Sequence, residues 1–182
     1  MVWCIFISMQ SIWFSLFLGI FSSFVASIVW FVLFSRLKPE IEISPKIARC
    51  IDSKDNVKYK IKIINKTKYD VNIEAKLYVV RTENGIDGEI CIRKRISLIV
   101  DKLFLLRKFK KNDEKDRYAF RFILKKDINK VWVDDTNQRL RFCIYAKHSL
   151  SGFGKSFVQE YRKKDLDIKD GDYVIGNTFD IK

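Results

Sequence analysis

The first feature of the chain is a long apolar run at its amino-terminus. Val2 to Phe34 contains no charged residue, and Gln10 and a few serines are its only strongly polar members. As a helix, the run would reach roughly 50 Å at ~1.5 Å per residue, against a bilayer hydrocarbon core of about 30 Å. It therefore predicts one transmembrane helix with an overhang, with a span at about residues 12–34 inside a membrane anchor of residues 1–35.

A secretory signal peptide is the alternative for this segment, and orientation depends on the same flanks. A signal peptide needs a basic region before a short apolar core. No basic residue precedes the run, and the run is too long. Basic residues follow it instead, at Arg36, Lys38, Lys46 and Arg49. The positive-inside rule then predicts a single-pass protein of the inner or plasma membrane, with its carboxyl-terminal domain in the cytoplasm.

Small residues recur at every fourth position of the apolar run: Ser11, Ser15, Gly19, Ser23 and Ser27. Such spacing lets two helix backbones approach closely in lipid, although serine and glycine are also common in spans that do not associate. We take Ser15, Gly19, Ser23 and Ser27 as a candidate face for helix association, which predicts a homo-oligomer. No charged residue lies in the span, which argues against a proton relay within it.

After the anchor, the pattern changes to the alternation that is typical of half-buried strands. Residues 57–63 place apolar and lysine side chains on opposite faces, namely Val57, Tyr59, Ile61 and Ile63 against Lys58, Lys60 and Lys62. Residues 71–79 repeat the alternation after a polar break, and we expect the two segments to pair as an antiparallel unit. This places a juxtamembrane linker and first strand at residues 36–56 and a β-sandwich domain at residues 57–182.

Further alternating segments follow at residues 89–100, 117–124, 139–147, 155–161 and 173–181. Turn residues separate them, and helical periodicity is scarce. We therefore predict an all-β fold, an antiparallel immunoglobulin-like β-sandwich of seven to eight strands after one transmembrane helix, with a small barrel as second choice. Cys91 and Cys143 share faces with Arg93 and Arg141, so the inter-sheet cysteine pair of antibody domains is not expected.

The chain resembles a group of largely uncharacterised bacterial proteins with one amino-terminal span and an immunoglobulin-like domain. Three stretches carry the resemblance: Lys58 to Lys66 (KYKIKIINK), Trp132 to Asp135 (WVDD) and Leu140 to Gly154 (LRFCIYAKHSLSGFG). It covers most of the part that follows the anchor. The resemblance implies an architecture and supplies no activity.

The motifs that carry chemistry are few. Gly154-Lys155-Ser156 looks like the end of a phosphate-binding loop, but Ser149 stands where that motif needs glycine, so a hairpin turn is favoured. His148 is the only histidine and follows the apolar parity of its strand, which favours a buried structural role. Asp134 and Asp135 are two adjacent acids that more often form a turn than a metal site. We expect no enzyme, no cofactor and no metal.

Charge gives the strongest surface signal. The chain has 35 Lys and Arg, 22 Asp and Glu and a net charge of +13, and none of these residues precedes Arg36. Alternation points many of the cations outward, and we take the following as a basic surface for lipid or another anionic partner: Lys58, Lys60, Lys62, Arg93, Arg95, Arg107, Lys108, Lys110 and Lys111. A solvated sheet face is the plainer explanation.

Anionic lipid headgroups are the first partner considered for this surface. The domain is tethered beside a negatively charged leaflet, and Leu103 to Leu106 followed by basic residues matches a segment that rests in the interface. A buried edge strand followed by a solvated loop is the alternative. Nucleic acid, with Tyr78, Tyr145 or Trp132 for stacking, is possible but not favoured, because no recognisable motif supports it.

Two functions remain open from the sequence. The first is a non-enzymatic membrane protein whose basic cytosolic domain acts as an interaction or sensing module for an unidentified cytosolic protein or ligand. The second is a membrane-permeabilising effector that oligomerises through its helix, in phage defence or a stress response. The row of small residues motivates the second, since helix oligomers lined by serine can form water-filled pathways through the membrane.

Overall fold

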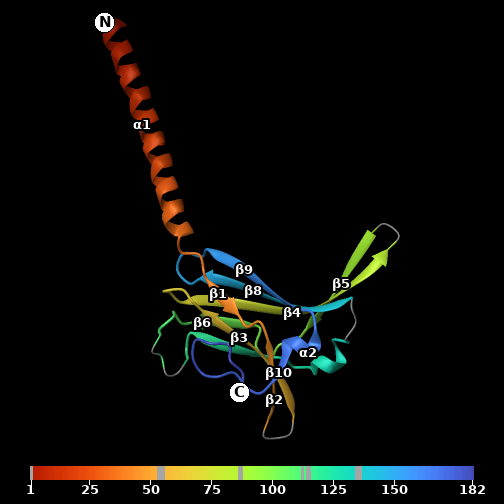
Figure 1. Ribbon diagram of the computed structural model, residues 1–182. Helices are drawn as coiled ribbons and strands as arrows, with labels where there is room; N and C mark the ends of the chain where they lie inside the picture. Colours follow the sequence, from red (N-terminus) through yellow and green to blue (C-terminus); the bar gives the residue numbers. More distant parts are fainter. Residues whose placement is uncertain (1, 53–55, 86–87, 112, 114–115, 134–136) are drawn as a thin grey trace. The chain divides into compact units, whose positions relative to one another are not determined.

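The computed structural model describes residues 2–52, 56–85, 88–111, 113, 116–133 and 137–182 (Figure 1). The chain forms two compact units, Met1–Leu37 and Lys38–Lys182. The first unit is one α-helix, and the second is mostly β, with antiparallel pairing in one sheet and mixed pairing in the other. The expected combination of one amino-terminal helix with a mostly β fold is confirmed.

The helix α1 runs from Val2 to Ser35. Its segment Trp13–Ser35 is long and apolar enough to cross a membrane. The hydroxyl of Ser22 donates to the carbonyl of Gly19, and that of Ser27 donates to the carbonyl of Ser23 at 2.8 Å. Bonds of this kind satisfy a serine hydroxyl inside its own helix, so these serines fit an apolar surrounding.

Sheet A is built around β3 (Val57–Asn65), the strand with the strongest alternation. Its partners are β1 (Ile41–Ile43), β2 (Ile47–Ile51) and β7 (Ala119–Ile123), and β10 (Ile168–Asp170) joins β2. β7 lies along one edge of β3, because Lys60 is paired with Ile123 on that side and with Ala48 of β2 on the other. The pairing of β10 with β2 is parallel, so this sheet is mixed.

Sheet B is built around β4 (Val71–Gly85), the longest strand. It contains β5 (Gly88–Ile96), β6 (Lys102–Leu106), β8 (Gln138–His148) and β9 (Gly154–Tyr161) in addition. β8 pairs along one edge of β4, and β5 and β6 follow each other along the opposite edge. A 3₁₀ turn at Ile128–Lys130 and a short α2 at Lys164–Asp167 complete the described elements.

The core lies between the two sheets. Alternate residues of both sheets, such as Ile61 and Leu77, form one buried cluster, and Trp132 joins it from the segment between β7 and β8. The rings of Phe122 in sheet A and Phe142 in sheet B meet at a centroid distance of 5.6 Å. Burial of these faces is the main stabilising term, because apolar surface leaves water on both sheets at once.

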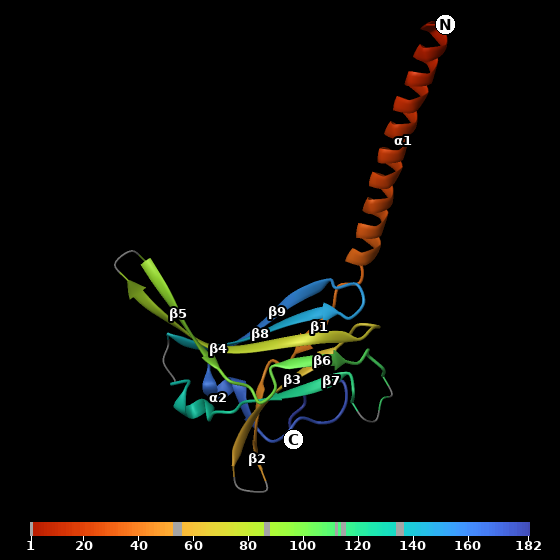
Figure 2. The same cartoon turned by 180° about the vertical axis from the view of Figure 1, so that it is seen from behind.

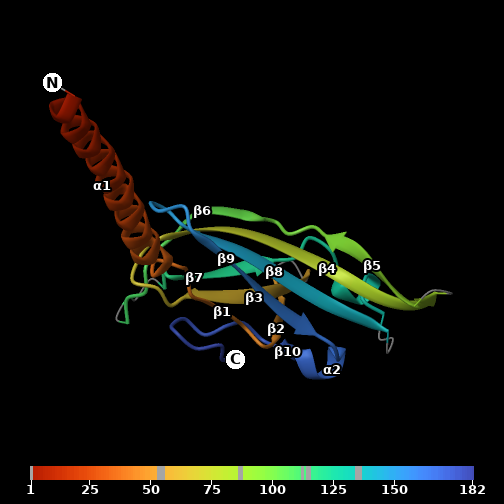
Figure 3. The same cartoon turned by 90° about the horizontal axis from the view of Figure 1, so that it is seen from above.

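The outer face of sheet A is also covered, by the carboxyl-terminal segment at residues 172–182, which we call the C-terminal segment (Figure 3). Tyr173 and Ile181 form a β-bridge within it and pack on Ala48 of β2. Gly171 introduces the segment with a φ of 121°, and a Cβ there would collide with the backbone of Lys182. A glycine is therefore needed at this turn.

Several strand predictions need correction. β3 and β4 do not pair, since each is the centre of a different sheet. The structure has ten strands within its described residues rather than seven to eight, and two of them, β1 and β2, fall within residues 36–56, where the sequence predicts a linker and one strand. The segment 173–181 contributes one bridge, and the last strand, β10, precedes it.

The far end of the β4 and β5 hairpin also differs from expectation. Ile90 and Ile92 share the parity of the buried Ile96, yet both are exposed. The hairpin extends past the rest of the domain as a two-stranded ribbon, so no opposite sheet covers these two side chains (Figure 2). The turn residue Asp87 lies outside the described residues.

Candidate interaction surfaces

The outer face of sheet B carries a concentration of cations, which we call the basic face. Its members are Lys76, Arg93, Arg95, Lys102, Arg139, Arg141 and Lys147. Tyr78 of β4 lies in the middle, opposite Arg95 of β5 on one side and Arg141 of β8 on the other. Arg93 and Arg95 are both exposed. The predicted placement of these two residues on an outer face is confirmed.

One carboxylate organises the arginines of this face. Glu160 of β9 accepts two hydrogen bonds from Arg141, at 2.8 and 2.5 Å, and lies 3.4 Å from Arg139 and 3.3 Å from Arg162. Burial alone would raise the pKa of Glu160, but the hydrogen bonds from Arg141 and Arg162 and the charge of Arg139 bring it below its ordinary value. The three arginine side chains are thus held in place, and the cluster of three arginines around one carboxylate keeps a net positive charge.

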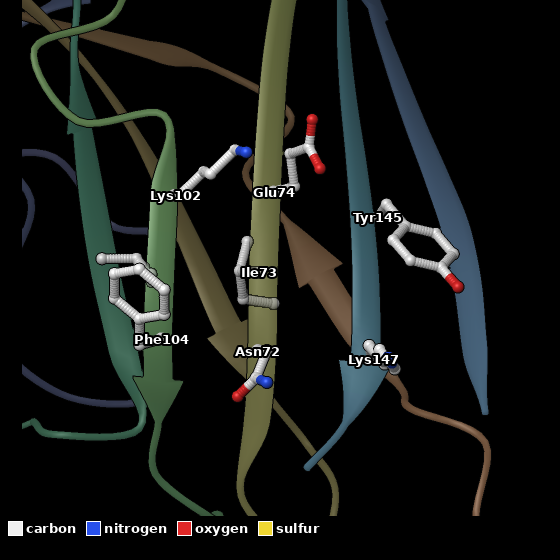
Figure 4. A pocket seen from close by; sticks show the side chains of 8 residues that line it. Asn72, Ile73, Glu74, Lys102, Phe104, Tyr145 and Lys147 are labelled. Atoms are coloured by element: carbon white, nitrogen blue, oxygen red, sulfur yellow. The ribbon is translucent and has the colours of Figure 1, made fainter. Parts of the chain in front are cut away.

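A shallow pocket of about 200 Å³ opens on the same face (Figure 4). Phe104 of β6 and Tyr145 of β8 stand on either side of β4, with Glu74 between them and the ammonium groups of Lys102 and Lys147 nearby. No pattern in the sequence predicts this pocket. It is formed by side chains from three strands that are distant in the chain.

The lysines of β3 do not form the predicted surface. Lys62 is fully buried, Lys60 pairs with Asp172 at 2.5 Å, and Lys58 pairs with Asp52 at 2.5 Å. The reason is the C-terminal segment, which covers the outer face of sheet A and supplies Asp172. Lys62 is therefore removed from the basic surface, and Lys58 and Lys60 are largely neutralised on it.

Lys62 makes an unusual set of buried contacts. Its ammonium donates to the carbonyls of Val174, Gly176 and Thr178 at 2.9, 2.6 and 3.0 Å. Asp116, also buried, lies 3.5 Å away and is 3.2 Å from Arg121. Burial lowers the pKa of Lys62, and Asp116 opposes that effect. The three donors of the ammonium match three carbonyls, so Lys62 fastens the C-terminal segment to sheet A.

A third surface lies where the chain enters the domain, and we call it the linker-side end. Tyr69 donates its hydroxyl to the carbonyl of Lys38 at 2.6 Å, and the amide of Lys66 donates to the carbonyl of Glu40. The carboxylate of Asp70 accepts from the amide of Lys108 at 2.7 Å. The carbonyl of Asp70 accepts from the hydroxyl of Ser149 at 3.2 Å. Four segments far apart in sequence are thereby joined.

The linker-side end exposes large apolar side chains. Leu150 is 91% exposed, Phe104 87% and Leu105 54%. Leu106, the last residue of β6, pairs with Val71 and is buried because its side chain belongs to the core cluster. The sequence supports two interpretations of residues 103–106, an interfacial segment or a buried edge strand. The structure shows an edge strand of which Phe104 and Leu105 point into water. The predicted surface residues that follow it are all exposed: Arg107, Lys108, Lys110 and Lys111.

The remaining chemical candidates have structural surroundings. His148 is buried, its Nδ1 accepts the amide of Ser151 at 2.9 Å, and Tyr69 packs edge-on against its ring. The expected buried histidine with partners is confirmed. Gly154 begins strand β9 rather than a helix. Asp134 and Asp135 lie outside the described residues.

On α1, the candidate association residues Ser15, Gly19, Ser23 and Ser27 are exposed within their unit. A Cβ added at Gly19 would meet no atom within 4 Å. The row of small side chains therefore leaves room for another helix. Free thiols are present at Cys50, Cys91 and Cys143.

No family model and no curated protein sequence matches this chain. One similar solved structure is the CsuC-CsuE chaperone-tip adhesion subunit pre-assembly complex from archaic chaperone-usher Csu pili of Acinetobacter baumannii. Its TM-score is 0.38 at 12% identity, over 69% of this chain and 57% of that one. Another is DesR, a β-glucosidase from Streptomyces venezuelae in complex with D-glucose, with a TM-score of 0.30 at 12% identity, over 67% of this chain and 15% of that one.

Proposed function

We propose that the chain is a non-enzymatic, single-pass protein of the inner or plasma membrane. In this proposal α1 is the anchor, and the domain is an immunoglobulin-like sandwich in the cytoplasm that recruits an acidic macromolecular partner. Arg36 and Lys38 directly follow the apolar segment and support the cytoplasmic side. Only Arg36 to Glu40 separate α1 from β1, so an anchored domain stays close to the membrane.

The observation that carries the proposal is the basic face of sheet B. Most cations of sheet A are buried or paired with acids. On the basic face, Arg93 is exposed and has no ion pair among the described residues, Arg95 is exposed beside Asp101 at 3.1 Å, and Glu160 holds Arg141 in a fixed position. Prearranged charge of one sign raises the association rate and the selectivity for a partner of opposite sign. Tyr78 between the arginines adds a rigid contact surface of the kind enriched at interfaces.

The proposal is tested by crosslinking in cells with the full chain. Tyr78 is replaced by photoreactive benzoylphenylalanine, and Ile51, an exposed residue of β2, is replaced in a parallel variant. We expect a defined adduct from position 78, absent from position 51 and lost in the double variant Arg93→Glu, Arg95→Glu. The matched control Lys163→Glu, Lys169→Glu changes the net charge equally on exposed residues elsewhere and should keep the adduct.

Two results would contradict this interpretation. The first is an adduct that the control charge reversals remove as well as the Arg93 and Arg95 reversals do, because net charge alone would then explain binding. The second is the same adducts from positions 51 and 78, because contact would then not be specific to the basic face.

The second candidate function is the membrane-permeabilising effector, and the row of small residues on α1 favours it. A plain anchor has no need of Ser15, Gly19 and Ser23 on one face. Expression of the full chain, beside a chain that begins at Ser35, with a membrane-potential dye separates the two functions. Depolarisation by the full chain alone, lost on replacing these three residues with leucine, supports the effector. An intact potential in every case supports the adaptor.

A further inference from the structure

The exposed apolar side chains of the linker-side end belong to one rigid surface. Leu150 lies in the turn that follows β8, and Phe104 and Leu105 lie near the end of β6. Val71 of β4 is paired with both strands, with His148 on one side and Leu106 on the other. The two groups of apolar side chains therefore sit on either side of the same β4 terminus.

Hydrogen bonds connect this surface to the point where the anchor enters. Asn65 donates its amide to the carbonyl of Tyr69 at 3.0 Å and to that of Arg107 at 2.9 Å. Tyr69 in turn binds the carbonyl of Lys38, only three residues after α1 ends. The side chain of Asn65 is fully buried, so its own two bonds are largely shielded from water. The apolar side chains and the entry point thus form one end of the domain.

The same end is positively charged. Its exposed cations lie in the turn between β3 and β4, in the loop after β6, and in β8 and β9: Lys68, Arg107, Lys108, Lys110, Lys111, Lys147 and Lys155. The carboxylate of Asp70 is occupied by the amide of Lys108. Among the ion pairs of the described residues, none involves Arg107, Lys108, Lys110 or Lys111. All four are exposed, so their charge can attract an external anion.

We infer that the linker-side end binds the surface of an anionic bilayer. Leu150, Phe104 and Leu105 enter the interface, while Arg107 and Lys108 lie among the headgroups. Apolar side chains flanked by cations give this kind of binding, because insertion removes apolar area from water while the cations attract anionic lipid. The inference rests on the proposed function for one point, that α1 spans the membrane and keeps this end near it.

Exposed leucines elsewhere in the domain do not share these features. Leu166 of α2 is also exposed, but β9 runs from Gly154 beside Lys147 to Tyr161 beside Leu140, so α2 follows the opposite end of sheet B. Its neighbours Lys164, Asp165 and Asp167 have mixed charge. Leu166 is therefore a matched apolar control that should stay in water.

The test uses the full chain in lipid nanodiscs. A nitroxide is attached at Leu150→Cys or at Leu166→Cys, with the native cysteines changed to serine, and its collisions with oxygen and with a water-soluble nickel chelate are compared. We expect the label at 150 to be shielded from nickel in discs of phosphatidylcholine with phosphatidylglycerol, and the label at 166 to be accessible. Arg107→Glu with Lys108→Glu should restore access at 150, since each lost cation weakens docking by roughly fivefold.

Equal nickel access at 150 and 166 in anionic discs would overturn the inference. It would also be overturned if the label at 150, in the variant with both charge reversals and in discs of phosphatidylcholine alone, were shielded as well as in the parent in anionic discs. Amide hydrogen exchange on the unaltered chain gives a second measurement: residues 103–108 and 149–153 should exchange more slowly only in anionic discs. Failure of the anchor is recognised separately, because alkaline carbonate would then extract the chain from membranes. Failure of partner binding is also recognised separately, because the crosslink from position 78 depends on Arg93 and Arg95, which are not part of this end.

Discussion

Lys62 and Asp116 lie 3.5 Å apart beneath the C-terminal segment, and both side chains are buried. Asp116 adopts a positive φ of 50° at the turn before β7, which brings its carboxylate back toward β3. The lysine binds three carbonyls of the C-terminal segment, and the aspartate offsets its charge. A residue that alternation assigns to the outside is therefore part of the interior.

Replacement of Lys62 tests that role. Lys62→Met keeps the length of the side chain but leaves the three carbonyls and Asp116 without their buried cation. We expect a loss of about 3 kcal/mol in the free energy of unfolding, because breaking a buried ion pair leaves polar groups uncompensated. Urea unfolding of the full chain in detergent, followed by circular dichroism, measures it. Lys58→Met, which removes an exposed ion pair, should cost less than about 1 kcal/mol, and equal effects of the two would refute the role.

The contact between Phe122 and Phe142 joins the two sheets and should carry a large share of core stability. Phe142→Ala removes a fully buried ring from that contact and leaves a cavity between the sheets. We expect the free energy of unfolding to fall by about 3–5 kcal/mol in the same urea experiment. Tyr145→Ala, on the opposite face of β8, should cost far less because its ring is half exposed. Similar losses for both would mean that the sheets do not pack through this pair.

Glu160 should make stability depend on acid pH. Burial opposes its ionisation, but hydrogen bonds from Arg141 and Arg162 bring the pKa below the ordinary value of 4.5. Since the pKa is lower in the folded chain, the contribution to stability is complete above about pH 4.5 and is lost as pH falls through the folded-state pKa.

The variant Glu160→Gln measures this contribution. At pH 7 it should be less stable than the parent by about 1 kcal/mol, a value reduced for partial solvent exposure. The difference should shrink as the pH is lowered below 4.5. Glu83→Gln, which removes the exposed pair with Arg81, serves as the control. A difference for Glu160→Gln that stays constant from pH 7 to the acid range would contradict the argument.

The sequence predicts one side of each strand well. Ile61, Leu77 and Phe142 all lie in the core, because a period of two marks the residues that face the opposite sheet. It does not predict what lies on the other side. Lys62 and Arg93 have the same alternating context, yet a segment more than a hundred residues later covers the first, and the second faces water.

Contacts between distant segments explain the other differences. Ile90 continues the alternation of its strand beyond the point where the facing sheet ends, which no local pattern reveals. The linker-side end depends on Asn65 and Asp70, whose bonds reach Arg107, Lys108 and Ser149. In the sequence these two residues mark only a polar break between strands. The basic residues of the loop after β6 are recognisable in the sequence because four of them fall within five positions, at residues 107–111.

The row of small residues on α1 should mediate self-association of the helix. Replacing Ser15, Gly19 and Ser23 with leucine fills the row of small residues, so two backbones can no longer approach closely, and pairing should weaken by roughly tenfold. Energy transfer between two labelled full chains in vesicles measures the pairing at several ratios of lipid to protein. The control triple variant Phe17→Leu, Ile20→Leu, Phe21→Leu alters exposed large residues outside the row and should pair like the parent. If the small-residue variant also pairs like the parent, the row is not the helix interface, and the permeabilising function loses the feature that favours it.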